Sequence, residues 1–171
     1  FRYTKIEAKI SKTFITKSLG ASKIQISAGK VFGDVPYSKL YNGHGSYKKF
    51  TIESENSFGT MRLNEFISDR FFSVFFNHDF GNLLFRTKFF NPGIVFVTNI
   101  GFGYLSKPEK HDNIEFTTME KGYYESGILI NNILAPGFIG YGFGILYRYG
   151  PYSLSKTSDN FAYKLTIVFN L

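Results

Sequence analysis

The last eleven residues of the chain alternate between two kinds of side chain, a pattern typical of a β-strand. Large apolar groups occupy the odd positions and smaller or polar groups most even ones: Phe161, Tyr163, Leu165, Ile167, Phe169 and Leu171 against Ala162, Lys164, Thr166, Val168 and Asn170. About 9–11 residues of a tilted strand cross a bilayer, whereas strands of soluble sheets average about five or six residues. The length therefore predicts a strand that spans a membrane.

The preceding segment, residues 139–149, strengthens this prediction. One of its faces is bulky and apolar and the other is mostly glycine: Ile139, Tyr141, Phe143, Ile145, Tyr147 and Tyr149 against Gly140, Gly142, Gly144, Leu146 and Arg148. Glycine weakens an ordinary strand because it has no side chain to pack. We therefore expect the glycine face to line a crowded or curved lumen.

Similar alternation recurs upstream, in residues 3–15, 22–32, 70–80, 83–90, 93–105 and 121–134, and a weaker strand is predicted within residues 48–64. No segment predicts a helix. The predicted fold class is all-β: an antiparallel transmembrane β-barrel with eight or nine up-and-down strands in this chain. Residues 1–171 are expected to form a single outer-membrane barrel region.

The strand number leaves two alternatives. The predicted segments come to nine, whereas bacterial single-chain barrels have even numbers of strands. We favour a chain that forms the C-terminal half of a larger barrel. The alternative is a small, complete barrel of eight strands.

The predicted connections are of two kinds. Tight links are expected at 17–20, 67–69, 91–93 and 135–137, and longer loops at 33–47, 106–120 and 150–159. Outer-membrane barrels have short periplasmic turns and longer extracellular loops. With the C-terminus in the periplasm, all four tight links are predicted to lie on the periplasmic side.

Composition fits this interpretation. The chain has 21 Phe and 12 Tyr but no Trp, its mean hydropathy is only -0.10, and no apolar run approaches the roughly 18 residues of a membrane-spanning helix. A barrel combines these properties because only alternate residues meet lipid. The absence of cysteine excludes disulfides and Cys-based metal sites.

The net charge of +7 admits several partners. Solvated loops and a polar lumen are the favoured explanation, with attraction to anionic lipid headgroups as an alternative. Nucleic-acid binders gather their basic residues on one face. Here Lys and Arg are scattered, so outer-membrane lipid is the expected partner and nucleic acid is not.

Five charged residues share the parity predicted to face the lumen: Arg86, Lys88, Glu125, Arg148 and Lys164. A charge facing lipid near the midplane would cost roughly 2–4 kcal/mol, which favours the inward orientation. The hairpin about Pro136 is expected to bring Glu125 beside Arg148, and we predict that the two pair across the sheet. Such residues serve as structural filling of a lumen, as a polar conduit, or as a latch for a plug.

Tyrosines near the predicted strand ends are expected to form interfacial girdles, because the ring is apolar and the hydroxyl seeks water. These are Tyr104, Tyr123, Tyr124, Tyr149 and Tyr152. In a soluble protein the same residues would line a ligand pocket.

Three histidines, His44, His78 and His111, raise the question of catalysis. A nucleophile needs a base within hydrogen-bond reach and a group that orients the base. The sequence has no Gly-x-Ser-x-Gly motif and no closely spaced set of His and carboxylate residues. We expect no catalytic residues, no metal and no cofactor.

Four segments in order resemble the C-terminal part of a Bacteroidota-type outer-membrane family of unknown function that carries an N-terminal carboxypeptidase-regulatory-like domain. They are Gly33–Tyr41, Leu63–Phe71, Lys121–Gly127 and Tyr147–Tyr152, and the resemblance covers residues from about 30 to the end. That family is in turn loosely similar to the Omp85 barrel superfamily. The resemblance implies a bacterial outer-membrane location and other outer-membrane or periplasmic proteins as partners.

The chain departs from the Omp85 pattern at two places. Those barrels carry an Arg-Gly-Phe/Tyr tip on a loop inside the lumen, whereas the corresponding loop here, 33–47, contains Tyr41-Asn-Gly-His-Gly-Ser-Tyr. The final residue is Leu171 where outer-membrane proteins commonly have Phe.

The expected function is that of a non-enzymatic outer-membrane barrel in protein assembly, secretion or transport. One alternative is a soluble, lipocalin-like barrel that binds an apolar ligand. Another is a small outer-membrane enzyme.

Overall fold

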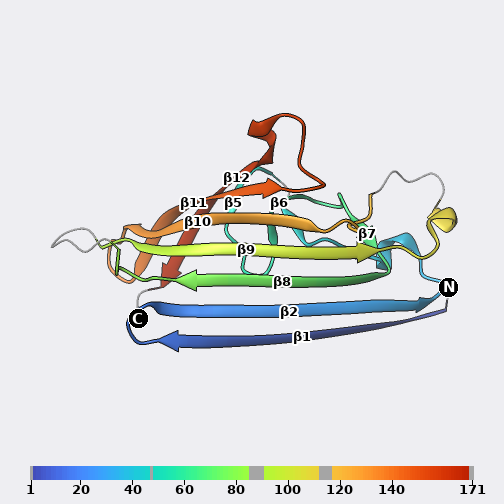
Figure 1. Ribbon diagram of the computed structural model, residues 1–171, viewed down its shortest axis with the longest axis horizontal. Helices are drawn as coiled ribbons and strands as arrows, with labels where there is room; N and C mark the ends of the chain where they lie inside the picture. Colours follow the sequence, from blue (N-terminus) through green and yellow to red (C-terminus); the bar gives the residue numbers. More distant parts are fainter. Residues whose placement is uncertain (1, 47, 85–90, 112–116, 170–171) are drawn as a thin grey trace.

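The structure, a computed structural model, describes residues 2–46, 48–84, 91–111 and 117–169. Its main element is one large sheet in which each long strand pairs antiparallel with the next long strand of the chain (Figure 1). The long strands are β1 (Tyr3–Thr16), β2 (Gly20–Gly33), β8 (Arg70–Asp79), β9 (Gly93–Tyr104), β10 (Tyr123–Leu134), β11 (Ile139–Tyr149) and β12 (Phe161–Phe169). The fold is therefore all-β, as predicted.

The other elements are short and lie in the connections. They are β3 (Tyr41–Asn42), β4 (Gly45–Ser46), β5 (Phe50–Ile52), β6 (Phe58–Arg62), β7 (Ile67–Ser68) and the 3-10 helices η1 (Tyr37–Lys39), η2 (Pro108–His111) and η3 (Thr157–Asn160). None of the helices that the described residues form is long and apolar enough to cross a membrane.

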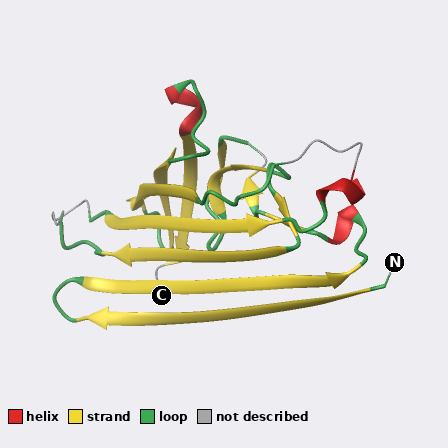
Figure 2. Ribbon diagram, turned by 45° about the vertical axis from the view of Figure 1, so that its right-hand side comes forward, coloured by secondary structure: helices red, strands yellow, loops and turns green. Residues whose placement is uncertain are grey.

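The strand order of the large sheet is β1-β2-β8-β9-β10-β11-β12-β5. The last pair is parallel and joins Phe50–Ile52 to the edge of β12. Figure 1 shows β1, β2, β8 and β9 side by side, with β11 and β12 turned steeply against them, and Figure 2 shows the same curl from the side. Within the described part of the chain β1 does not pair with β12, so the sheet curls without closing into a barrel.

All seven long strands coincide with predicted segments to within two residues. The strand predicted within 48–64 is wrong as a member of the up-and-down series. Those residues form β5 and β6, whereas β2 pairs directly with β8. For the segment predicted at 83–90, residues 85–90 lie outside the described residues, and β8 pairs directly with β9. The chain thus supplies seven long strands in its described parts, not eight or nine.

The three long loops share one end of the sheet, as predicted, because they follow β2, β9 and β11, which run in the same direction. The turns at 17–19 and 135–138 lie at the opposite end. The link at 67–69 is an exception to the prediction: it precedes β8 at the long-loop end, because no spanning strand separates it from β2.

The outer face of the sheet is apolar and exposed. Ile128 in the middle of β10 is 53% exposed and lies between Phe96 of β9 and Ile145 of β11. Further exposed apolar residues continue this surface over all the long strands: Ile10, Phe14, Ile26, Phe72, Phe102, Ile130, Tyr141, Phe143, Tyr163, Ile167 and Phe169. A contiguous apolar surface of this kind is unusual on a protein that meets only water.

The inner face is mixed: Val95, Val97, Leu129 and Leu146 form a buried apolar cluster on it, and polar groups are buried there as well. Arg148 and Lys164 are only 2% and 3% exposed, although both are charged. Neutral polar side chains of the same face are buried with them: Gln25, Ser27, Ser73, Asn99 and Thr166. The sheet thus differs from a soluble sandwich, in which the buried faces are apolar: it buries charged groups and exposes apolar ones, and we call this distribution its inverted polarity.

The long connection from β2 to β8, residues 34–69, covers the inner face, and we call it the inner segment. Its Phe58, Met61 and Phe66 are each at most 2% exposed and pack with Phe75 of β8 and Tyr123 of β10. The rings of Phe58 and Tyr123 meet edge to face with centroids 5.2 Å apart. The curl of the sheet thus encloses part of its own chain.

Glycines on the inner face make room for this segment. A Cβ atom on Gly101 of β9 would lie 2.7 Å from the ring of Phe58, which is buried and cannot move aside. A Cβ atom on Gly93 of the same strand and face would find its nearest neighbour at 3.7 Å, an ordinary contact.

This contrast predicts different effects for two identical substitutions. Gly101→Ala should lower the free energy of unfolding by about 1–3 kcal/mol, because the added methyl group overpacks the interior. Gly93→Ala should be neutral or stabilising by up to about 1 kcal/mol. Urea unfolding of both variants, followed by circular dichroism, measures the difference. Equal effects would show that Phe58 does not pack on Gly101.

Candidate functional site

Three charged residues on the inner face of the long strands attach the inner segment to the sheet. Among them, Glu125 of β10 makes the most hydrogen bonds. Its carboxylate is completely buried and accepts hydrogen bonds from the backbone N–H groups of Gly59 and Thr60, each at 2.8 Å. The hydroxyl of Thr60 and the Nδ2 of Asn99 donate to the same carboxylate. Hydrogen bonds to an ionised group are stronger than neutral ones, so Glu125 fixes β6 to the wall.

Arg148 of β11 provides the second attachment. Its Nη1 lies 2.7 Å from Oε1 of Glu65 in the inner segment, and only 3% of the Arg148 side chain is exposed. The guanidinium carbon lies 4.8 Å from the ring centroid of Tyr123 and 5.7 Å from that of Phe66. The second oxygen of Glu65 accepts from the backbone of Arg62, so the ion pair also closes a turn of the segment.

Lys164 of β12 provides the third attachment. Its Nζ donates to the hydroxyls of Ser46 and Thr51 at 2.9 and 2.7 Å. Nearby, burial raises the pKa of the Glu53 carboxyl and the charge of Glu55 adds to this, while Lys164 and Lys23 act in the opposite direction. Strands β10, β11 and β12 therefore each bind the inner segment through one charged side chain, and these charges are of both signs.

Tyr41 extends the attachment to the opposite side of the sheet. Its hydroxyl donates to the backbone oxygen of Ile6 in β1 at 3.0 Å, and the Nζ of Lys5 lies 3.7 Å from its ring centroid. Gly29 of β2 leaves the space for the ring, since a Cβ atom there would come within 2.6 Å of the hydroxyl. The inner segment thus bridges β1 and β12, the last long strands on either side.

Little space remains where the segment meets the wall. The cavity beside Asn99 and Lys164 has a volume of about 20 Å³, roughly enough for one water molecule. A larger hollow of about 430 Å³ lies between the segment and β12, lined in part by Lys49, Arg62 and Asp159. Lys49 pairs there with Asp159 at 2.7 Å. The inner segment therefore fills much of the space on the concave side of the described sheet.

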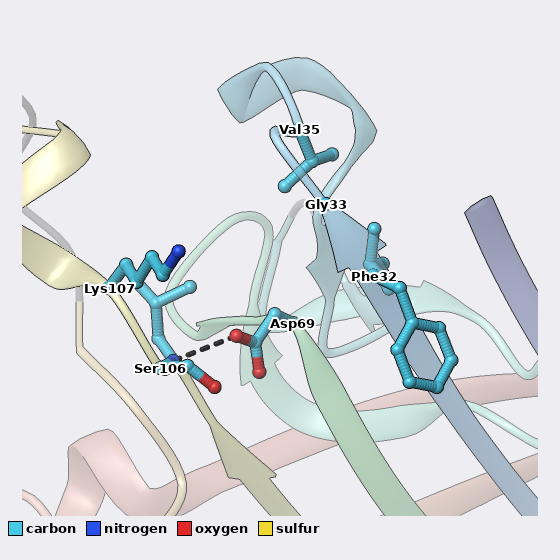
Figure 3. Close-up of a pocket in the computed structure, with 8 residues that line it drawn as sticks. Phe32, Gly33, Val35, Asp69, Ser106 and Lys107 are labelled. Atoms are coloured by element: carbon cyan, nitrogen blue, oxygen red, sulfur yellow. Dashed lines mark hydrogen bonds between the residues drawn. The ribbon is translucent and has the colours of Figure 1, made fainter. Parts of the chain in front are cut away.

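A third hollow of about 210 Å³ lies at the long-loop end. Figure 3 shows Asp69 in it, accepting a hydrogen bond from the backbone nitrogen of Ser106 at 2.8 Å, with Lys107 and Val35 nearby. The other carboxylate oxygen of Asp69 is buried and has no hydrogen-bond partner among the described residues. The contact joins the end of the inner segment to the loop that follows β9.

The predicted lumen residues fall into two groups. Glu125, Arg148 and Lys164 lie buried on the inner face, whereas Arg86 and Lys88 lie outside the described residues. Glu125 and Arg148 are neighbours in register on adjacent strands, as expected. The predicted pairing of their side chains is wrong, because Arg148 pairs with Glu65 and Glu125 is saturated by the N–H groups of β6.

Three of the predicted girdle tyrosines, Tyr104, Tyr124 and Tyr149, lie on the outer face near the long-loop end. Tyr123 is a correction: it is 0% exposed and lies on the inner face. Adjacent residues of a strand point to opposite faces, so Tyr123 and Tyr124 cannot both face outward. Tyr152 is the second correction, since its ring packs inward on Phe66 at 5.0 Å.

None of the three histidines contributes a described side-chain contact to the attachment of the inner segment. His78 of β8 contacts Ser22 of β2 through Nδ1 at 2.7 Å, and its Nε2 lies 2.9 Å from the backbone oxygen of Leu19. This arrangement ties β8 to the turn between β1 and β2. His44 lies in the inner segment with a φ of 50°, and the side chain of His111 is outside the description. Among the described residues no His, Asp and Glu side chains gather as they would around a metal ion.

Comparison with protein-family models, with curated proteins and with solved structures finds no match.

Sequence patterns alone did not reveal which residues of the inner segment contact the long strands. Thr60, Glu65 and Tyr41 belong to a segment without regular alternation, and their contacts span 35 to 83 residues along the chain. The signal that could have pointed to these contacts was the set of charged residues predicted to face inward, since buried charges require partners.

The Glu125 contacts predict a local effect of mutation. Glu125→Gln replaces one acceptor oxygen with an NH₂ group that cannot accept the N–H donors of β6, so the segment should be destabilised by roughly 3 kcal/mol. Hydrogen exchange of the Gly59 and Thr60 amides should accelerate correspondingly. Glu120→Gln, in an exposed loop, is the control and should leave both amides unchanged. Unaltered exchange in the Glu125 variant would contradict the attachment.

The ion pair predicts energetic coupling between two residues 83 positions apart. In a double-mutant cycle with Glu65→Gln and Arg148→Met, the coupling in the free energy of unfolding should be about 1–3 kcal/mol. Chemical denaturation of the four proteins gives this value. Simple additivity would mean that the pair does not form in solution.

Proposed function

We propose that this chain is part of the wall of a bacterial outer-membrane β-barrel, with its outer face in lipid and the inner segment plugging the lumen. The observation that carries the proposal is the inverted polarity of the sheet: apolar residues such as Ile128 are exposed outside, while Glu125, Arg148 and Lys164 are buried inside. In lipid this distribution is the stable one, because charges near the midplane cost roughly 2–4 kcal/mol each.

Strand length supports the same proposal. The long strands have 9 to 14 residues, and about 9–11 tilted residues cross a bilayer. The tyrosines Tyr104, Tyr124 and Tyr149 gather near one end of the strands, as expected at the boundary between lipid and water.

The free edge of β1 supports a larger barrel as the complete assembly. In lipid every backbone N–H and C=O group must be paired, and among the described residues β1 has a hydrogen-bonded neighbour on only one side. We propose that further strands of the barrel pair with this edge, which makes the chain one part of the wall.

For function, we propose a non-enzymatic role in outer-membrane protein assembly, secretion or transport, in keeping with the resemblance to the Bacteroidota family. The inner segment is attached to β1, β10, β11 and β12 by side-chain contacts, so that releasing it would open the lumen. The soluble, lipocalin-like alternative requires an apolar cavity inside the sheet, and here that side is filled by the inner segment, which packs on apolar and polar side chains of the long strands.

Lysine substitutions on the outer face test the membrane assignment. Ile128→Lys in the middle of β10 should cost about 2–4 kcal/mol in phosphatidylcholine vesicles, and Leu134→Lys at the end of the same strand about 0–1 kcal/mol. Both residues are exposed, so in a water-soluble protein each substitution should change the stability by less than about 0.5 kcal/mol. A protein that stays monomeric in plain buffer and tolerates both changes would refute the proposal.

A further inference from the structure

The apolar outer face carries two adjacent cations near the long-loop end. Lys30 of β2 and Arg70 of β8 are partners in register and both are exposed. Opposed residues of antiparallel strands have Cα atoms about 4.5–5.5 Å apart, so one small anion can contact both side chains. Two like charges placed side by side repel each other, and an anion between them would remove that cost.

Each of the two cations lies close to a neighbouring aromatic ring. The guanidinium carbon of Arg70 lies 4.0 Å from the ring centroid of Tyr104, and the Nζ of Lys30 lies 4.7 Å from that of Phe32. Within the described chain neither cation forms an ion pair with a carboxylate. A guanidinium stacked on a ring keeps its N–H donors available at its edge, so both groups can still bind an anion.

An apolar groove of about 300 Å³ begins beside Arg70. Phe72, Phe102, Tyr104 and the acidic residue Glu120 are among the residues that line it. The carboxylate of Glu120 accepts a hydrogen bond from the hydroxyl of Thr118 at 3.1 Å. The site therefore combines a pair of cations and an adjoining apolar groove on a single surface.

We propose that this surface binds a phosphorylated membrane lipid, with the phosphate between Lys30 and Arg70 and an acyl chain in the groove. Arginine suits phosphate because its planar fork donates two parallel hydrogen bonds. A free phosphate ion would use only the cations and leave the groove empty. The inference rests on the proposed function, because it requires the outer face to meet lipid.

The depth of the site agrees with this ligand. Arg70 begins β8 and Tyr104 ends β9, so both lie where the strands meet the long loops. Lipid phosphates lie at this boundary, together with the aromatic girdle. The acyl chain would run from there toward the middle of the outer face.

Native mass spectrometry in a neutral maltoside detergent tests the site. The probes are dioleoyl phosphatidic acid, dioleoylglycerol, which has the same chains without phosphate, and inorganic phosphate. The wild-type protein should retain phosphatidic acid and bind dioleoylglycerol at least about tenfold more weakly, a difference of roughly 1.4 kcal/mol. In the double variant Lys30→Gln/Arg70→Gln this preference should disappear.

Lys12→Gln is the matched control. Lys12 is also on the outer face and beside a ring, with its Nζ 5.0 Å from the centroid of Phe14, but it does not line the groove. This variant should bind phosphatidic acid like the wild type. Phe102→Ala should weaken phosphatidic acid binding without changing the binding of inorganic phosphate.

Three outcomes overturn the inference. They are equal binding of the two lipids, unchanged binding in the double variant, and displacement of phosphatidic acid by millimolar inorganic phosphate, which would indicate a site for the free ion. Solubility in plain buffer separates the two proposals. A protein that needs detergent but binds no phosphatidic acid refutes the lipid site alone, whereas a protein that is monomeric without detergent refutes the membrane assignment itself.

Discussion

The structure depends on one constraint. Alternate residues of a β-strand point to opposite faces of the sheet, and in this chain the two faces have different surroundings. Along β11 the outer positions are aromatic and branched, while Gly140, Gly142 and Gly144 face inward beside Arg148. The register of every long antiparallel pair keeps like faces together. A shift by one residue would exchange the two surfaces, so the polarity pattern also fixes the pairing.

The inner segment follows from that constraint. Charges turned inward need partners, and a curled sheet without a ligand offers few of them. Here the chain supplies its own partners: backbone N–H groups for Glu125, a carboxylate for Arg148 and hydroxyls for Lys164. The same segment brings Phe58 to the empty space over Gly101. Polar and apolar contacts thus select one position for the segment.

The sequence predicted the long strands well because each contains its own signal. Alternation in β12 or β11 is local and needs no knowledge of the rest of the fold. Residues 48–64 of the inner segment were predicted as a spanning strand because Phe50, Ile52 and Phe58 also alternate over a short distance, and nothing local shows that β2 pairs with β8. Among the candidate site residues, parity placed Glu125, Arg148 and Lys164 on the inner face, where the structure has them, but could not give their partners in the inner segment, which lie 65 to 118 residues away. The same alternation contradicts the girdle assignment of Tyr123. Tyr123 and Glu125 are two residues apart on one strand, so they face the same side of the sheet.

The unpaired side of β1 has a consequence for handling the isolated polypeptide. Along the 14 residues of β1, alternate N–H and C=O groups point away from β2 and pair with no other strand of the described chain, so they are open to any strand that approaches. The outer face of the same strand carries Ile6, Ile10 and Phe14. When the polypeptide is refolded alone, two copies can satisfy each other edge to edge. Such chains would add to one another and precipitate as fibrous or amorphous material.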